Sequence, residues 1–149
     1  MRLHRLRAIP VAAVLALLAI ASVACQVPRD TVDILYVGNS YVYFNNLPDL
    51  VEGISRGLDG PVVRGTAHTH GGATLSGHLE DGHLPGILSQ GPRNGGDWDW
   101  VMLQEQSTLG TTYDPDLGLL GSPEAFHAAT RERVGMVKAV GARPALYMT

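Results

Sequence analysis

A short apolar run that ends in Gly38, Asn39 and Ser40 has the residue types of a serine nucleophile site. The run ILYV at residues 34–37 predicts a buried strand, and the small polar triplet after it predicts a tight turn. A serine on such a turn can attack a carbonyl if a base and donors to the developing oxyanion lie nearby. The alternative is that Asn39 or Ser40 only caps the following helix. The donors and the base must therefore come from elsewhere in the sequence.

Two later segments contain suitable hydrogen-bond donors. Gly71 and Gly72 follow a second predicted strand, and a glycine N–H can approach a ligand closely because no Cβ intervenes. Gln106 lies in the segment QEQS after a third strand, and its side-chain amide can donate as well. The carboxyl ends of parallel strands meet at one edge of a sheet, so we expect these residues near Ser40. Glu105 and Ser107 are expected to stabilise this loop.

Several histidines raise the possibility of a metal site. His68 and His70 alternate along a strand and so share one face, and catalytic zinc usually takes three protein ligands. The pair is followed by His78 and His83, but the spacing matches no recognised ligand motif. The sequence therefore predicts no metal site. His127 lies inside a predicted helix and is expected to be a surface residue.

Apolar runs and helical patterns alternate along the chain. Strands are expected at residues 33–37, 61–69, 98–103 and 144–148, the second nearer an edge because its apolar content is modest. Apolar residues recur at helical spacing in residues 47–58 and, more briefly, in residues 75–84. This order predicts an α/β domain with a parallel sheet.

The helix before the last strand has the clearest boundaries. Ser122 is expected to be its N-cap, Pro123 its first residue and Gly141 its stop. The preceding residues, 107–121, are rich in Gly, Thr, Asp and Pro, and we expect them to form a long loop beside the site.

Three segments in this order resemble the first three motif blocks of the SGNH/GDSL hydrolase superfamily. They are ILYVGNSYVYFNNLPDLV, GGATLSGHL and WDWVMLQEQS, and they are most similar to the branch with Gly-Asn-Ser at the nucleophile. The resemblance covers residues 32–149 and implies a three-layer α/β/α sandwich with a parallel, flavodoxin-like sheet. It implies that Ser40 is the nucleophile and that the N–H groups of Ser40 and Gly72 bind the oxyanion, with Gly71 as the alternative. Gln106 stands where the family usually has an asparagine, and it is the third candidate donor.

The sequence departs from this family in one block. The family's Asp-x-x-His block supplies the base and the carboxylate that orients it, and no Asp-x-x-His occurs in these 149 residues. The domain at residues 32–149 is therefore expected to be incomplete at its C-terminus, with the base beyond Thr149. Because loss of a triad member costs on the order of 10^4 to 10^6 in rate, these residues alone are expected to be almost inert.

The N-terminus has the pattern of a secretory signal peptide over residues 1–24. Arg2, Arg5 and Arg7 precede the mostly apolar residues 8–23, and small residues precede Cys25. Cys25 is the only cysteine, and its position resembles a bacterial lipobox, in which it would carry a lipid. The alternative is a secreted protein whose cysteine is incidental. Residues 25–31 are expected to be a short tether, and the protein is expected to be secreted or bound to the cell envelope.

Composition and charge argue against one class of function, the binding of nucleic acid. The net charge of -3 becomes -6 without residues 1–24, which contain three arginines and no acidic residue, so nothing favours nucleic-acid binding. No cofactor is expected, and membrane contact is expected only through a lipid at Cys25. The resemblance implies a serine esterase that acts on an acylated carbohydrate or another ester, since many members of the family remove acetyl groups from carbohydrates.

The sequence leaves two alternatives to a serine esterase. One is a non-catalytic, glycan-binding surface lipoprotein of the same fold. The other is a flavodoxin-like binder of phosphate or flavin, which is disfavoured because apolar and aromatic residues, rather than hydroxyl residues and glycines, follow the serine at 41–44. Tyr41, Tyr43 and Phe44 either line an acyl or sugar pocket or are simply buried.

Overall fold

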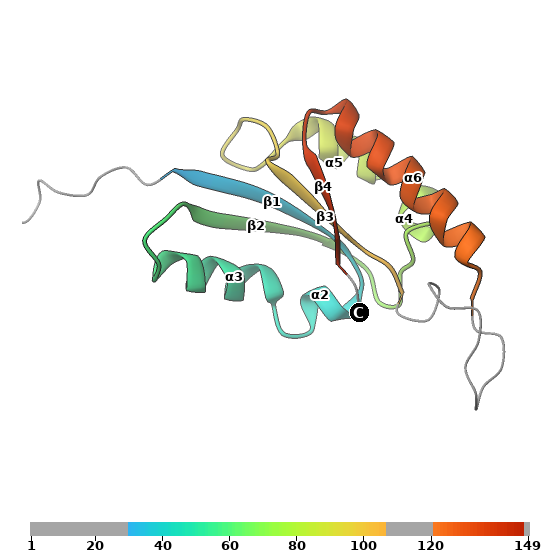
Figure 1. Ribbon diagram of the computed structural model, residues 1–149, viewed down its shortest axis with the longest axis horizontal. Coiled ribbons are helices and arrows are strands. Elements are labelled where there is room, and N and C mark those ends of the chain that lie inside the picture. Colours follow the sequence, from blue (N-terminus) through green and yellow to red (C-terminus); the bar gives the residue numbers. More distant parts are fainter. Residues whose placement is uncertain (1–29, 107–120, 148–149) are drawn as a thin grey trace, which may run out of the picture.

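The computed structural model describes residues 30–106 and 121–147, which form a parallel sheet between two layers of helices (Figure 1). The strands are β1 (Thr31–Gly38), β2 (Val62–Thr69), β3 (Trp100–Gln104) and β4 (Arg143–Tyr147). Their order is β2-β1-β3-β4, and every neighbouring pair is parallel. The predicted α/β class, the four strands and the edge position of the second strand are confirmed, and the arrangement is consistent with an SGNH or flavodoxin-like fold.

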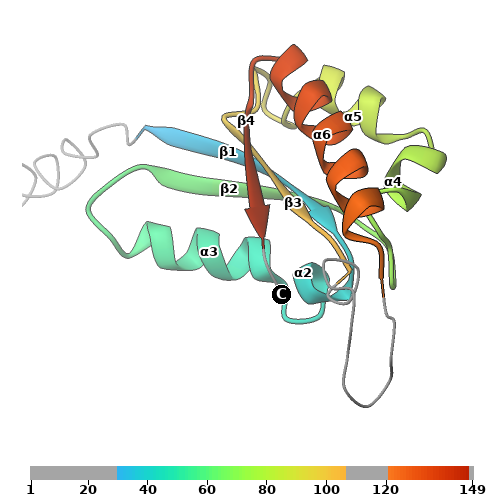
Figure 2. The same cartoon turned by 45° about the vertical axis from the view of Figure 1, so that its right-hand side comes forward.

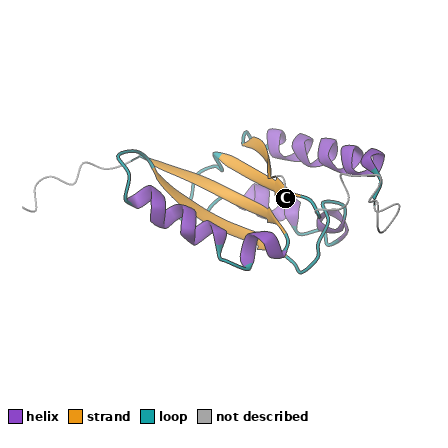
Figure 3. Ribbon diagram, turned by 60° about the horizontal axis from the view of Figure 1, so that its bottom comes forward, coloured by secondary structure: helices purple, strands orange, loops and turns teal. Residues whose placement is uncertain are grey.

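The helices lie on both faces of this sheet. Helices α2 (Ser40–Tyr43) and α3 (Leu47–Arg56) cover one face, and α4 (Gly77–Glu80), α5 (Leu84–Gln90) and α6 (Pro123–Ala139) cover the other (Figures 1 and 2). Figure 3 shows the strands between the two helical layers. The prediction of one short helix over residues 75–84 was wrong, because a turn at Gly82, with a φ of 68°, separates α4 from α5.

The hydrophobic core lies between the sheet and the layer of α4, α5 and α6. Leu35 and Val37 of β1 are fully buried there, because a central strand of a parallel sheet is covered on both faces. The other buried members of this core are Leu75, Leu84, Leu88, Trp98, Val101, Leu103, Ala129, Val137 and Ala142.

Helix α6 has the predicted boundaries and one unexpected buried residue. The Ser122 hydroxyl accepts the Ala125 N–H at 3.2 Å, and Gly141 adopts the left-handed φ of 82° that ends the helix. Arg133 is fully buried, and its Nη2 donates to the Leu75 carbonyl. This burial lowers the pKa of Arg133 from its ordinary value. Arg133 therefore joins α6 to the segment before α4.

Helix α3 packs on β2 through small and polar residues rather than through its apolar stripe. A Cβ at Gly65 would lie 2.6 Å from the Pro48 Cβ, so the glycine admits the start of the helix. The Ser55 hydroxyl accepts the Val63 N–H at 2.9 Å, which satisfies a donor on the outer edge of β2. Three apolar residues of the predicted pattern are exposed, with fractions of 52% for Leu50, 65% for Ile54 and 59% for Leu58, whereas Leu47 and Val51 are half-buried. Their spacing predicts the helix correctly but not the side that faces the sheet.

Several predictions concern residues outside the described ranges. These are the signal peptide, the lipidation of Cys25, Ser107 and the loop after it up to residue 120. β1 begins at Thr31, the residue at which the tether was expected to end. Within the described ranges, no helix has the length and apolar character needed to span a membrane.

Candidate active site

Ser40 is the first residue of α2, directly after the central strand β1. The helix cap is Asn39, whose Oδ1 accepts the Tyr41 N–H at 3.2 Å and whose side chain is fully buried. Ser40 is only half-buried, and no residue of the described ranges forms a hydrogen bond with its hydroxyl. Of the two readings of this turn, the capping role thus falls to Asn39, and the Ser40 hydroxyl is left for another role.

The Asn39 amide joins the three predicted site segments. Its Nδ2 donates to the Ala73 carbonyl at 2.9 Å and to the Gln106 Oε1 at 3.0 Å. One side chain, next to Ser40, thereby holds the residue after Gly72 and the third candidate donor. The three segments meet at the carboxyl edge of the sheet as expected, while the catalytic roles of Ser40, Gly72 and Gln106 stay predictions.

The buried side-chain amide of Gln104 supports the turn at Asn39. Gln104, at the end of β3, is fully buried, and its Oε1 accepts the Asn39 N–H at 2.8 Å. Its Nε2 donates to the Glu105 carbonyl. A Cβ at Gly38 would lie 2.5 Å from the Gln104 Oε1 and 3.0 Å from the Val42 Cγ2. The glycine before Asn39 is therefore needed for this close approach, a role of Gln104 that the sequence pattern did not reveal.

Glu105 has the loop-stabilising role that the sequence predicts. Its Oε1 accepts the Gln106 N–H at 2.7 Å and the Leu75 N–H at 3.0 Å. The carboxylate therefore fixes the backbone of Gln106 against the segment that follows Gly72. Its Oε1 is thus engaged by two backbone donors.

The candidate oxyanion donors are available for a ligand. Gly72 is exposed with a φ of 67°, in a turn in which the Ala73 N–H donates to the His70 carbonyl at 3.2 Å. In the described part of the chain, no acceptor is hydrogen-bonded to the N–H of Ser40 or of Gly72. The Gln106 Oε1 faces Asn39, so its amino group is the end that can donate elsewhere.

The aromatic residues after Ser40 are exposed rather than buried. The exposed fractions are 53% for Tyr41, 45% for Tyr43 and 80% for Phe44. The Tyr43 hydroxyl would lie 3.3 Å from a Cβ at Gly71, so this ring reaches the glycine turn. Of the two possibilities that the sequence left open, simple burial is excluded, and an aromatic surface lies beside the site.

The described histidines make no hydrogen bond with the candidate nucleophile. No imidazole of residues 30–106 and 121–147 is hydrogen-bonded to Ser40. His127 is exposed on α6, 5.5 Å from the Phe126 ring, and is a surface residue as predicted.

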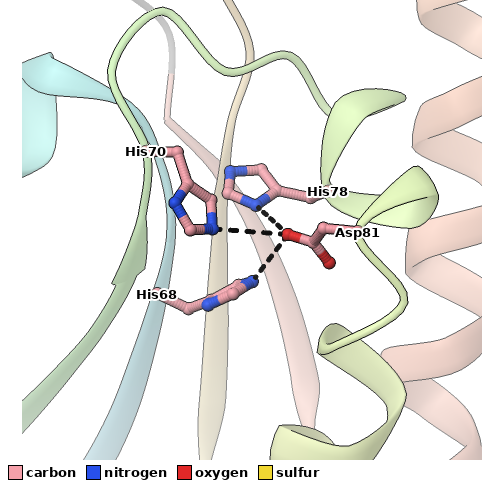
Figure 4. A group of neighbouring side chains, drawn as sticks. All are labelled: His68, His70, His78 and Asp81. Carbon is pink, nitrogen blue, oxygen red and sulfur yellow. Dashed lines mark ion pairs between the residues drawn. The ribbon is translucent and has the colours of Figure 1, made fainter.

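The structure gathers three of the histidines around an acidic residue. His68, His70 and His78 surround Asp81 (Figure 4), whereas His83 lies outside the group and donates its N–H to the Asp81 Oδ1 at 2.9 Å. Burial lowers the pKa of His68, which the nearby His78 lowers further, and burial also lowers the pKa of His78. The spacing of the histidines gave no motif, and Asp81 was missed. The available signal was a carboxylate three residues after His78, which is the spacing of neighbours on one side of a helical turn.

Comparisons with known proteins show a similarity to a solved structure. No model of a known family matches the sequence, and no curated protein matches it. A solved structure from Slackia heliotrinireducens, described as "a putative SGNH hydrolase", is 31% identical with a TM-score of 0.58. The match covers 80% of this chain and 57% of that one, so the chain spans little more than half the length of this neighbour. The similarity supports the SGNH superfamily and a hydrolase function.

Proposed function

We propose that this chain is the N-terminal part of an SGNH-type serine esterase in which Ser40 is the nucleophile. The observation that carries the proposal is the Asn39 amide, which joins the Gly72 turn and Gln106 to the residue before Ser40. A nucleophile and its oxyanion donors must lie on one rigid frame, because only preorganised donors stabilise the charge that develops. The Slackia heliotrinireducens neighbour supports the same reaction class.

In the proposed reaction the Ser40 Oγ attacks an ester carbonyl. A histidine, oriented by an aspartate, accepts the Ser40 proton and later returns it to the leaving alcohol. The oxyanion is held by the N–H groups of Ser40 and Gly72 and by the Gln106 amino group, and loss of one such donor typically costs about 10^2 to 10^3 in turnover. On the basis of the family resemblance, we propose that the histidine and aspartate follow Thr149 in the sequence. The greater length of the neighbour's chain is compatible with this placement.

The proposed substrate is an acylated carbohydrate from which the enzyme removes acetyl groups. Tyr41, Tyr43 and Phe44 support this class, because exposed aromatic rings offer flat apolar faces of the kind on which sugar rings stack. The proposed location is outside the cell or on its envelope, with a lipid on Cys25. Mass spectrometry of the mature N-terminus tests the anchor, and an unacylated Cys25 would exclude it.

Labelling with a fluorophosphonate probe tests the nucleophile. We expect the full-length protein to be labelled, the Ser40→Ala variant to lose the label and the Ser76→Ala variant to keep it. Ser76 is a suitable control because it is an exposed serine just beyond the glycine turn. Equal labelling of the wild-type and Ser40→Ala proteins would remove Ser40 as the nucleophile.

The exposed aromatic surface also favours a second function, a glycan-binding protein of this fold without catalysis. This alternative predicts that the full-length protein binds acetylated oligosaccharides in calorimetry but neither reacts with the probe nor releases acetate. Acetate release that Ser40→Ala abolishes would exclude it.

A further inference from the structure

We propose that His68, His70, His78 and Asp81 form a zinc-binding site. His68 lies on β2, His70 directly follows that strand, His78 lies on α4 and Asp81 follows α4 (Figure 4). One ligand atom from each residue lies within 4.8 Å of all the others. The end of β2 and the region of α4, which a loop separates in the sequence, thus bring their ligand atoms together.

Three buried polar atoms at this point have no hydrogen-bond partner. They are the His68 Nε2, the His78 Nδ1 and the Asp81 Oδ2, and the His78 side chain is fully buried. Each unpaired buried polar atom costs about 1–3 kcal/mol, and native proteins contain few of them. A single cation between these atoms would satisfy all three.

Two of the three distances from the Asp81 carboxylate match the edge of a tetrahedral zinc site, and the third is longer. The Asp81 Oδ2 lies 3.4 Å from the His68 Nε2, 3.3 Å from the His70 Nε2 and 3.7 Å from the His78 Nδ1. Zinc bonds of about 2.0–2.1 Å in a tetrahedron place neighbouring ligand atoms about 3.3–3.4 Å apart. Direct hydrogen bonds between charged groups would be shorter, at about 2.7–2.9 Å.

The outer contacts of the cluster orient its ligands. The His78 Nε2 lies 2.9 Å from the Gly38 carbonyl, which can only accept, so this nitrogen carries the proton and the Nδ1 lone pair faces the cluster. Metal-binding histidines almost always make such a contact with their second nitrogen. The backbone N–H of His83 donates to the Asp81 Oδ1 at 2.9 Å, which leaves the Oδ2 for the ion.

The donor set indicates both the metal and its role. Three imidazoles and one carboxylate suit zinc, and four protein ligands complete a tetrahedral shell, as in structural zinc sites. The ion would fasten the end of β2 to α4 and so close the loop that contains Gly71 and Gly72. Through His78 and the Gly38 carbonyl, it would also support the strand that presents Ser40. Zinc binding does not require Ser40 to be a nucleophile, so it can be tested separately.

Metal titration of the full-length protein, prepared without a histidine tag, tests the site. After removal of metal with a chelator, we expect the protein to bind one Zn2+ per chain in competition with a chromophoric chelator. We expect Co2+ to give the strong visible absorption of a tetrahedral ion. An absence of stoichiometric binding, or the weak spectrum of octahedral Co2+, would overturn the proposal without reliance on any variant.

Two matched variants locate the ion. The His70 side chain is 56% exposed, so His70→Ala removes a ligand with little effect on the core. We expect this variant to bind Zn2+ more than about 100-fold more weakly, since loss of even an outer contact costs about 10- to 100-fold. His83→Ala, which removes an exposed histidine outside the cluster, should bind Zn2+ as the wild type does. Wild-type affinity in His70→Ala would overturn the assignment.

Discussion

Replacement of Asn39 by aspartate removes the contacts that join the site segments while it preserves the helix cap. The change turns one amino group into an oxygen. The acceptor of the Tyr41 N–H remains, but the donors to the Ala73 carbonyl at 2.9 Å and the Gln106 Oε1 at 3.0 Å are lost. In a side chain with 0% exposure, the new oxygen would face two other acceptors.

The expected cost is about 2–5 kcal/mol of unfolding free energy, because each unpaired buried acceptor costs about 1–3 kcal/mol. The lower end applies if the Gln106 amide flips, which would restore one contact but turn its amino group toward residue 39 and away from a substrate. For a urea m-value of about 2 kcal/mol/M, the unfolding midpoint should fall by about 1–2.5 M.

Urea unfolding followed by tryptophan fluorescence measures this effect, since Trp98 is 4% exposed and reports on the core. Asn45→Asp is the matched control: it makes the same chemical change at an exposed position and should alter stability by less than about 0.5 kcal/mol. If the Asn39→Asp and Asn45→Asp proteins unfold at the same urea concentration, the Asn39 amide does not hold the site together.

Two further predictions concern neighbouring residues and use the same urea assay. Gly38→Ala should destabilise the protein by about 1–3 kcal/mol, because its methyl group would lie 2.5 Å from the Gln104 Oε1. Gly53→Ala, in open space on α3, should stabilise it by about 0.5–1 kcal/mol, and equal effects of the two changes would contradict the packing argument. Glu105→Ala should cost about 1–3 kcal/mol more than Glu105→Gln, because only the glutamine keeps an acceptor for the two backbone donors; indistinguishable midpoints would show that these bonds are dispensable.

The sequence was sufficient to predict the sheet and the position of Ser40. Residues 34–37 form a continuous apolar run because β1 is covered on both faces, and the small polar residues that follow favour a turn or a helix cap. Ser122 and Gly141 likewise bound α6 through local hydrogen bonding and backbone conformation. These features depend on residues that are neighbours in the sequence, so the sequence alone predicts them.

Features that depend on how distant elements pack were not predictable in this way. His68 and Asp81 meet only because the loop after β2 brings α4 back beside that strand, and no spacing rule describes such a return. The outward side of α3 follows from the lack of a side chain at Gly65, on another element. The burial of Arg133 depends on a carbonyl of Leu75, 58 residues away.

The central place of β1 in an all-parallel sheet has a consequence for folding during synthesis. Each residue of β1 pairs with a β2 residue that comes 31 positions later in the sequence. On its other side, β1 pairs with β3 residues that come 66 positions later. At about 5–20 residues per second, the ribosome needs roughly 3–13 s to make the chain between β1 and β3. Throughout that time, the apolar residues 34–37 lack at least one of their two neighbouring strands, so this segment stays exposed to aggregation while the chain is being made.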